Sequence, residues 1–191
     1  MPDKVYVGYS IINWPTTCLP KIKGGLGILD LERFARALRI RWLWFQWRQK
    51  ERAWNKLELP CDSRDRELFA ASTIVTIGDG KFAKFWSSSW AQGQTLKNMA
   101  PTLFKKAKRK NITVQKALQD NKWLEHISPV FSPTELHEYV LLWNAVQQVQ
   151  LDESREDSIV WRWTADGEYT TKGAYRIQFQ GTFSKLKLTP V

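Results

Sequence analysis

The chain contains little cysteine and histidine, and it lacks the patterns that most metal sites require. Its 191 residues include two cysteines, Cys18 and Cys61, and two histidines, His126 and His137. No pair among these four residues has the close spacing of zinc ligands. We therefore expect free thiols, no disulfide framework, no metal site and no cofactor.

The sequence also has no apolar run long enough to cross a bilayer and no apolar segment near Met1 typical of a secretory signal. No two aspartates are adjacent, so the carboxylate pair with which polymerases clamp two divalent metals is missing. Neither histidine lies near a candidate nucleophile. These absences predict an intracellular protein of the nucleus or cytoplasm that is not an enzyme, has no catalytic residue and has no membrane partner.

Tryptophan and positive charge are abundant instead. The chain has 11 tryptophans and a formal net charge of +10. The excess of lysine and arginine lies in residues 1–125, whereas residues 126–191 are slightly acidic. A cationic protein attracts polyanions, and indole rings need either burial or a stacking partner. The composition therefore predicts nucleic acid as the partner.

An arginine- and tryptophan-rich helix is the most distinctive predicted element. Gly24-Gly25-Leu26-Gly27 is typical of a turn, and it lacks the Gly-Lys-Ser/Thr ending of a phosphate-binding loop. Asp30 then predicts the start of a helix by capping its first amides, and Pro60 limits the helix at its far end.

This helix is apolar on two faces, which is unusual for a surface helix. We expect the core face to be the stripe of Leu31, Phe34, Ala35, Leu38, Trp42 and Phe45. A second apolar stripe contains Ile40, Leu43, Trp44, Trp47 and Trp54. Either the chain wraps the helix or a partner covers its second face.

Further helices are predicted by their start signals. Asp62 and Ser63 cap a helix that reaches about Ala71, and Ser132-Pro133-Thr134-Glu135 is a capping box with proline at the first helical position. We expect short helices over residues 114–118 and after Thr171. The core face expected for the helix after Ser132 consists of Leu136, Tyr139, Val140, Trp143 and Val146.

Two β-hairpins are predicted by β-branched runs that precede glycine-containing turns. The first joins residues 73–77 to 81–86, and the second joins residues 158–163 to 168–171. The expected fold class is therefore α+β, dominated by helices, with one small sheet packed on them. We expect three segments: an extended part with the glycine turn (1–29), the Arg/Trp helix with the first hairpin (30–100), and a helical part with the second hairpin (101–191).

Acidic residues in the turns and in the linker are expected to be structural. Asp79 and Asp166 lie in glycine-containing turns, where aspartate accepts local hydrogen bonds. The acidic residues between 152 and 157 do not have the spacing of a calcium loop, and we interpret them as a solvated linker.

Two groups of residues are candidates for nucleic-acid binding. Cationic side chains would contact phosphates and indole rings would stack on bases. The candidates are Arg41, Arg48, Arg52, Trp44 and Trp47 in the helix and Lys105, Lys106, Lys108, Arg109 and Lys110 in a basic segment. The alternatives are that the tryptophans pack against a missing domain and that the basic residues form a solvated rim or loop.

Several motifs, in order along the chain, resemble one family. They are Trp14 with residues 18–21, residues 24–31, residues 37–44, residues 77–80 with Phe85, Trp86 and Trp90, residues 101–104, residues 157–163, residues 167–169, and Ala174 with Tyr175. This order is similar to that of the linker between the polymerase and the zinc-binding domain in plant non-LTR (LINE-type) retrotransposon reverse transcriptases.

The resemblance implies a non-catalytic fragment that ends before a zinc-binding domain. Its family role would be to help hold RNA or single-stranded DNA with low specificity, with a polymerase domain as a further partner. Two other functions stay open on the sequence. The first is a structural or protein-interaction remnant without a ligand. The second is a carbohydrate-binding module that uses its tryptophans as platforms.

Overall fold

The computed structural model describes residues 13–53, 57–127 and 132–180. The chain divides into two units, Met1–Leu38 with Thr171–Val191 and Arg39–Thr170. This division differs from the three consecutive segments 1–29, 30–100 and 101–191 that we expected, because residues from both ends of the chain belong to one unit. No helix within the described ranges is long and apolar enough to cross a membrane.

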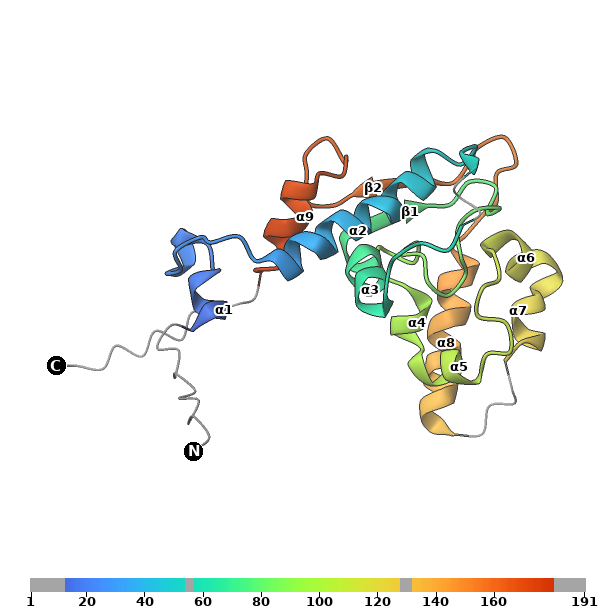
Figure 1. The fold of residues 1–191 in the computed structure, drawn as a ribbon. Coiled ribbons are helices and arrows are strands. Elements are labelled where there is room, and N and C mark those ends of the chain that lie inside the picture. Colours follow the sequence, from blue (N-terminus) through green and yellow to red (C-terminus); the bar gives the residue numbers. More distant parts are fainter. Residues whose placement is uncertain (1–12, 54–56, 128–131, 181–191) are drawn as a thin grey trace, which may run out of the picture. The chain divides into compact units, whose positions relative to one another are not determined.

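Short helices dominate both units, and each can be followed along the ribbon in Figure 1. The first unit contains α1 (Trp14–Thr17), a 3₁₀ turn (Lys21–Lys23), the first part of α2 (Leu31–Arg48) and α9 (Thr171–Ile177). The second contains the rest of α2, then α3 (Ser63–Ser72), β1 (Thr73–Thr76), α4 (Leu96–Met99), α5 (Pro101–Lys106), α6 (Val114–Leu118), a 3₁₀ turn (Gln119–Asn121), α7 (Lys122–Glu125), α8 (Pro133–Gln147) and β2 (Ser158–Trp161). The expected helix-dominated α+β class is confirmed.

The predicted helix starts are correct because they depend on local chemistry. The side chains of Asp30, Asp62 and Ser132 each accept a hydrogen bond from the backbone N–H three residues later, at 3.1, 2.8 and 3.2 Å. Each bond satisfies an N–H that has no partner inside its own helix. The short helix at residues 114–118 also has the expected bounds.

In the first unit, α9 packs against the start of α2. The ring of Tyr175 meets Phe34 edge-on with the ring centroids 6.4 Å apart, and its hydroxyl accepts a hydrogen bond from Asp30 N at 3.0 Å. Arg33 Nη1 donates to the carbonyl of Gln178 at 2.6 Å. The predicted helix after Thr171 therefore forms, and it contacts the start of α2 through both aromatic packing and hydrogen bonds.

The predicted hairpins are wrong, although their first strands are correct. β1 pairs with β2 in antiparallel register, with Thr73 opposite Trp161 and Thr76 opposite Ser158. Residues 81–86 and 168–171 do not form strands. The small sheet thus joins two segments that are far apart in the chain, and its buried face carries Val75, Ile159 and Trp161.

The carboxylate of Asp157 explains why the first hairpin does not close. Its Oδ1 accepts hydrogen bonds from the backbone N–H groups of Gly78 and Gly80 at 2.8 and 2.9 Å. Its Oδ2 accepts from Phe82 and Ala83 at 3.0 and 2.8 Å. These donors fold residues 78–83 around the carboxylate rather than along β1. The interpretation of Asp157 as part of a solvated linker is therefore wrong, since its side chain is buried.

The buried face of α2 is the opposite of the expected one. Ile40 is fully buried and the indole of Trp44 is only 4% exposed. Leu38, from the stripe expected to be the core, is 41% exposed, and Leu31 and Trp42 are exposed as well. The structure selects the second stripe because Trp44 stacks on Tyr169 and meets Trp161 edge-on. Trp54, also placed in that stripe, lies outside the described residues.

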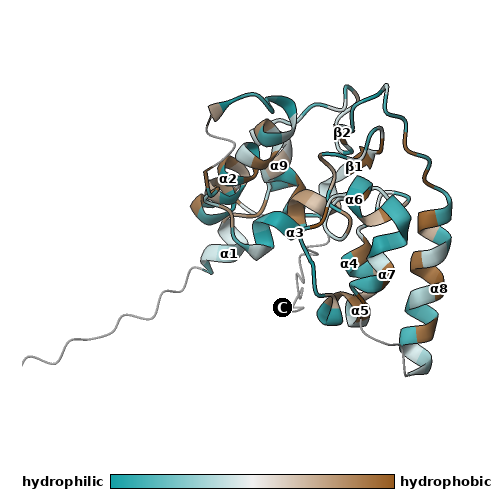
Figure 2. Cartoon of the chain, turned by 90° about the vertical axis from the view of Figure 1, so that its right-hand side faces the viewer, coloured by the Kyte–Doolittle hydropathy of each residue, from teal (hydrophilic) through white to brown (hydrophobic). Residues whose placement is uncertain are grey.

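The buried face of α8 also differs from the prediction. Leu136, Val140 and Trp143 are exposed, and Figure 2 shows hydrophobic residues along this helix. Of the expected core positions, Val146 is buried, but the same side of the helix also buries Leu142, Glu135 and Glu138. The apolar periodicity predicts the wrong face because two glutamates lie on the buried side of the helix, where each has a specific partner.

Glu138 caps α5 from another helix. Its two carboxylate oxygens accept hydrogen bonds from Thr102 N at 3.2 Å and Leu103 N at 2.9 Å. Pro101, at the first position of α5, has no N–H to satisfy. A negative charge here also interacts favourably with the positive end of the helix dipole. The second buried glutamate, Glu135, forms an ion pair with Lys106.

We expect Glu138→Ala to lower the free energy of unfolding by about 2 kcal/mol, because two backbone donors lose their acceptor. Urea denaturation followed by tryptophan fluorescence measures this change. His137→Ala, at the exposed neighbouring position of α8, is the control and should change stability by less than about 0.5 kcal/mol. Equal stability of the two variants would contradict the capping role of Glu138.

Candidate nucleic-acid interface

The arginines predicted on α2 lie at its exposed surface and in the residues that follow it. Arg41 stacks its guanidinium over Phe45, 4.8 Å from the ring centroid. Arg48 Nη2 forms an ion pair with Glu168 Oε1 at 2.6 Å, so its charge is partly neutralised. Arg52 is exposed after the end of α2. Arg41 and Arg52 thus remain accessible to a phosphate.

The two predicted stacking tryptophans have different environments. Trp44 is buried, and its ring stacks on Tyr169 with the centroids 6.2 Å apart. A base would have to displace this contact, so the packing does not fit a stacking role for Trp44. Trp47 is partly exposed and meets Phe82 edge-on at 4.8 Å. Trp47 keeps an accessible surface and remains a candidate.

The basic segment Lys105–Lys110 begins in the last turn of α5. Lys106 is occupied by its ion pair with Glu135, and Lys110 Nζ lies 5.2 Å from the ring centroid of Phe104. Lys105, Lys108 and Arg109 are exposed, and none of them forms an ion pair with another described residue. Four of the five predicted cations, Lys110 included, therefore have no ion-pair partner among the described residues.

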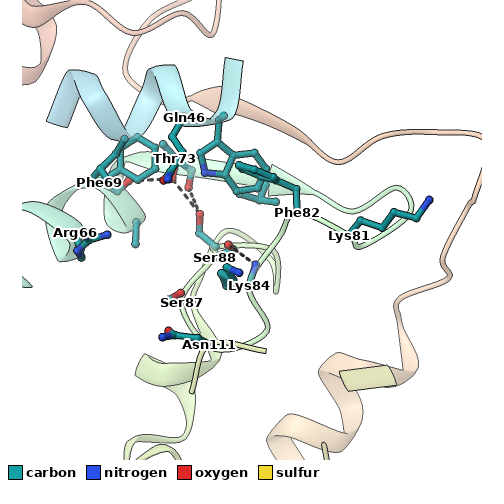
Figure 3. A pocket seen from close by; sticks show the side chains of 15 residues that line it. Gln46, Arg66, Phe69, Thr73, Lys81, Phe82, Lys84, Ser87, Ser88 and Asn111 are labelled. Atoms are coloured by element: carbon teal, nitrogen blue, oxygen red, sulfur yellow. Dashed lines mark hydrogen bonds between the residues drawn. The ribbon is translucent and has the colours of Figure 1, made fainter. Parts of the chain in front are cut away.

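A pocket of about 330 Å³ lies in the second unit and contains Trp47. Its walls come from the C-terminal part of α2, from α3 and β1, and from the loop that follows residue 80; Figure 3 shows the side chains. Its polar lining residues are Gln46, Arg66, Thr73, Lys81, Lys84, Ser87, Ser88, Ser89 and Asn111. The apolar ones are Leu43, Trp47, Phe69, Ala70, Val75 and Phe82. The lining thus includes three cationic side chains and no carboxylate.

The three cations of this pocket are not equivalent. In Figure 3 the side chain of Lys81 extends away from the other labelled residues, and its Nζ lies 3.3 Å from Asp79 Oδ2. Burial raises the pKa of Asp79, but the hydrogen bonds from Lys81 and the charges of Lys81 and Lys50 together lower it by more, so the pKa lies below its ordinary value. Arg66 and Lys84 are exposed and form no ion pair with any other described residue.

The hydroxyl groups that line the pocket also differ in their exposure and in their hydrogen bonds. Ser89 and Thr73 are buried, with their hydroxyl oxygens 3.2 Å apart. Ser88 Oγ accepts a hydrogen bond from Lys84 N at 2.9 Å, which still leaves its own hydrogen to donate (Figure 3). Ser87 is exposed. The mouth of the pocket therefore combines hydrogen-bond donors with positive charge.

Sequence reasoning missed most of this pocket. The sequence pattern gives no signal at Arg66, and it predicts Lys84 in a strand that does not form. A signal was present in the serine run at residues 87–89, which is unusual beside two aromatic residues. It could not be interpreted without the fold, because its partners on α3 lie about 20 residues earlier in the sequence.

The remaining candidates have structural roles or no common site. Asp79 and Asp166 accept hydrogen bonds from the backbone two residues later, as predicted. Burial raises the pKa of the Cys61 thiol, which disfavours the thiolate form that binds metals. Within residues 13–53, 57–127 and 132–180, no three His, Cys, Asp or Glu side chains are arranged to hold a metal ion.

Comparison with family models, with curated proteins and with solved structures produced no match for this chain.

Proposed function

We propose that this chain is a non-catalytic module that associates with RNA or single-stranded DNA through a basic surface. We further propose that it corresponds to the connector between polymerase and zinc-binding domain in LINE-type reverse transcriptases. In that role it acts in the nucleus or cytoplasm, and a polymerase domain is its second partner.

The observation that carries the proposal is a set of exposed cations without carboxylate partners. In the unit Arg39–Thr170 these include Arg66, Lys84, Lys105, Lys108 and Arg109, judged within the described residues. Charges that are already paired contribute little to phosphate binding, whereas free ones release counterions from the nucleic acid when they bind. The net charge of +10 adds a long-range attraction of the same sign.

The motifs behind the family resemblance are also consistent with one functional unit. Asp157, the first residue of one motif, accepts hydrogen bonds from Gly78 and Gly80 of another. Two motifs separated by most of the second unit are thus joined by a buried carboxylate. The two motifs therefore belong to one structural unit, as the proposal requires.

We expect the purified chain to bind a labelled single-stranded oligonucleotide with an affinity that falls as salt rises. With about four phosphate contacts, the affinity for a single strand should drop on the order of fiftyfold between about 50 and 200 mM salt. Fluorescence anisotropy titrations with RNA and DNA of the same sequence measure this. Absence of binding at low salt, or affinity that does not change with salt, would contradict the proposal.

The same titrations distinguish the two alternatives. A protein-interaction remnant would bind neither oligonucleotide, and a carbohydrate-binding module would bind a neutral glycan with little dependence on salt. The described chain does expose Trp42, Trp143 and Trp163. Their exposure does not favour sugars over other ligands, whereas the unpaired cations do favour a polyanion.

A further inference from the structure

We propose that the pocket shown in Figure 3 binds one nucleotide unit, either free or within an unpaired strand, by its phosphate and its base. This inference rests on the proposed function and adds a defined site to it. The chemical class of ligand is a nucleoside monophosphate. Two sides of the pocket match these two parts of the ligand.

The phosphate would bind at the two unpaired cations. Arg66 on α3 and Lys84 on the following loop both line the pocket, and neither has a carboxylate partner among the described residues. A guanidinium binds phosphate oxygens with two N–H donors and an ammonium adds a point charge. The hydroxyls of Ser87 and Ser88 lie in the same lining and can donate to the remaining oxygens. The missing carboxylates matter, because one acidic side chain here would repel the phosphate.

The base would pack on the aromatic side of the pocket. The partly exposed rings of Trp47 and Phe82 line it, and Leu43 and Phe69 lie among the apolar lining residues. Stacking on an aromatic ring is sequence-tolerant because every base has a π-face. The side-chain amides of Gln46 and Asn111 also line the pocket, and each offers both a donor and an acceptor to a base edge.

The size of the pocket limits what can enter. A volume of about 330 Å³ lies at the lower end of the range for small-molecule sites, which begins near 300 Å³. A base in a duplex would first have to leave its stack, which is unfavourable. The site therefore selects unpaired strands over duplexes.

The test compares two double variants that remove the same charge. Arg66→Gln with Lys84→Gln alters the pocket. Arg64→Gln with Lys116→Gln is the matched control, because these two residues are exposed, lie outside the pocket and have no ion-pair partner among the described residues. At physiological salt we expect the pocket variant to bind a single-stranded oligonucleotide roughly tenfold more weakly and the control to stay within about twofold. Thermal melting checks that both variants are folded.

Two further readouts identify the ligand source and the role of the base. Adenosine monophosphate should bind the wild-type chain in calorimetry and displace the oligonucleotide, whereas inorganic phosphate at equal ionic strength should be weaker. Trp47→Leu should reduce affinity about fivefold to tenfold without changing the salt dependence, while the pocket variant should reduce the steepness of that dependence. A blunt duplex should bind the wild type more weakly than the single strand does.

The outcomes separate this inference from the proposed function. If the wild type binds the oligonucleotide but the pocket and control variants bind equally well, the pocket is not the site and the general function survives. If the wild type binds no oligonucleotide yet binds adenosine monophosphate through Arg66 and Lys84, the proposed function fails and the pocket is a free-nucleotide site. If the wild type binds neither ligand, both proposals are overturned.

Discussion

Asp157→Ala is expected to lower the free energy of unfolding by about 4 kcal/mol, because four backbone N–H groups would lose their acceptor at once. The carboxylate is 5% exposed, and at least three of its four hydrogen bonds lie in a buried environment. Water cannot easily replace it at that depth. Because the loss is so large, we expect the urea midpoint of unfolding to fall clearly. Tryptophan fluorescence during urea denaturation measures this midpoint.

Asp152→Ala is the matched control for this experiment. Asp152 belongs to the same acidic segment, but it is exposed, and its carboxylate accepts its hydrogen bonds from the backbone and the hydroxyl of Ser154. Its loss should cost less than about 1 kcal/mol. Asp157→Asn should be intermediate, since an amide offers one oxygen acceptor and presents a donor to the other N–H groups. If Asp157→Ala were no more damaging than Asp152→Ala, residues 78–83 would not depend on this carboxylate.

Ile40→Ala is expected to destabilise the protein by about 3 kcal/mol. Ile40 has no exposed surface in the inner face of α2, and removing a buried aliphatic side chain costs about 2–5 kcal/mol in transfer and cavity free energy. Thermal and urea denaturation of the full chain measure the change, and circular dichroism confirms that the helical content of the folded variant is preserved.

Leu38→Ala provides the comparison on the outer face of the same helix. Leu38 lies two residues earlier and remains 41% exposed, so its replacement should cost less than about 1 kcal/mol. The two substitutions remove side chains of equal size, and any difference reports the orientation of α2. A larger effect at Leu38 than at Ile40 would mean that the stripe expected from the sequence is the core after all.

Features that depend on neighbouring residues could be predicted from the sequence. The caps at Asp30, Asp62 and Ser132 satisfy amides within the next turn, so their chemistry is complete within a few residues. The aspartates of the two glycine-containing turns are similar, because each accepts a bond from the backbone two residues later. The β-character of residues 73–76 and 158–161 followed from their β-branched side chains.

Features that depend on distant partners could not be predicted. Both faces of α2 are apolar, so periodicity alone cannot decide which one meets Trp161 and Tyr169. On α8 the pattern favoured the wrong face, because a glutamate is counted as an outward residue unless its partner is known. Glu138 has that partner in the first turn of α5, 35 residues earlier in the chain.

The sequence by itself determined the helix-dominated class, the helix starts and the cationic character of this protein, because each is a sum of local propensities or charges. Tertiary structure alone decided which strands pair, which faces are buried and which cations share a pocket. The carboxylate of Asp157 illustrates the reason, since it binds amides more than 70 residues away. The free energy of such a contact depends on burial and on the geometry of groups that only the folded chain brings together.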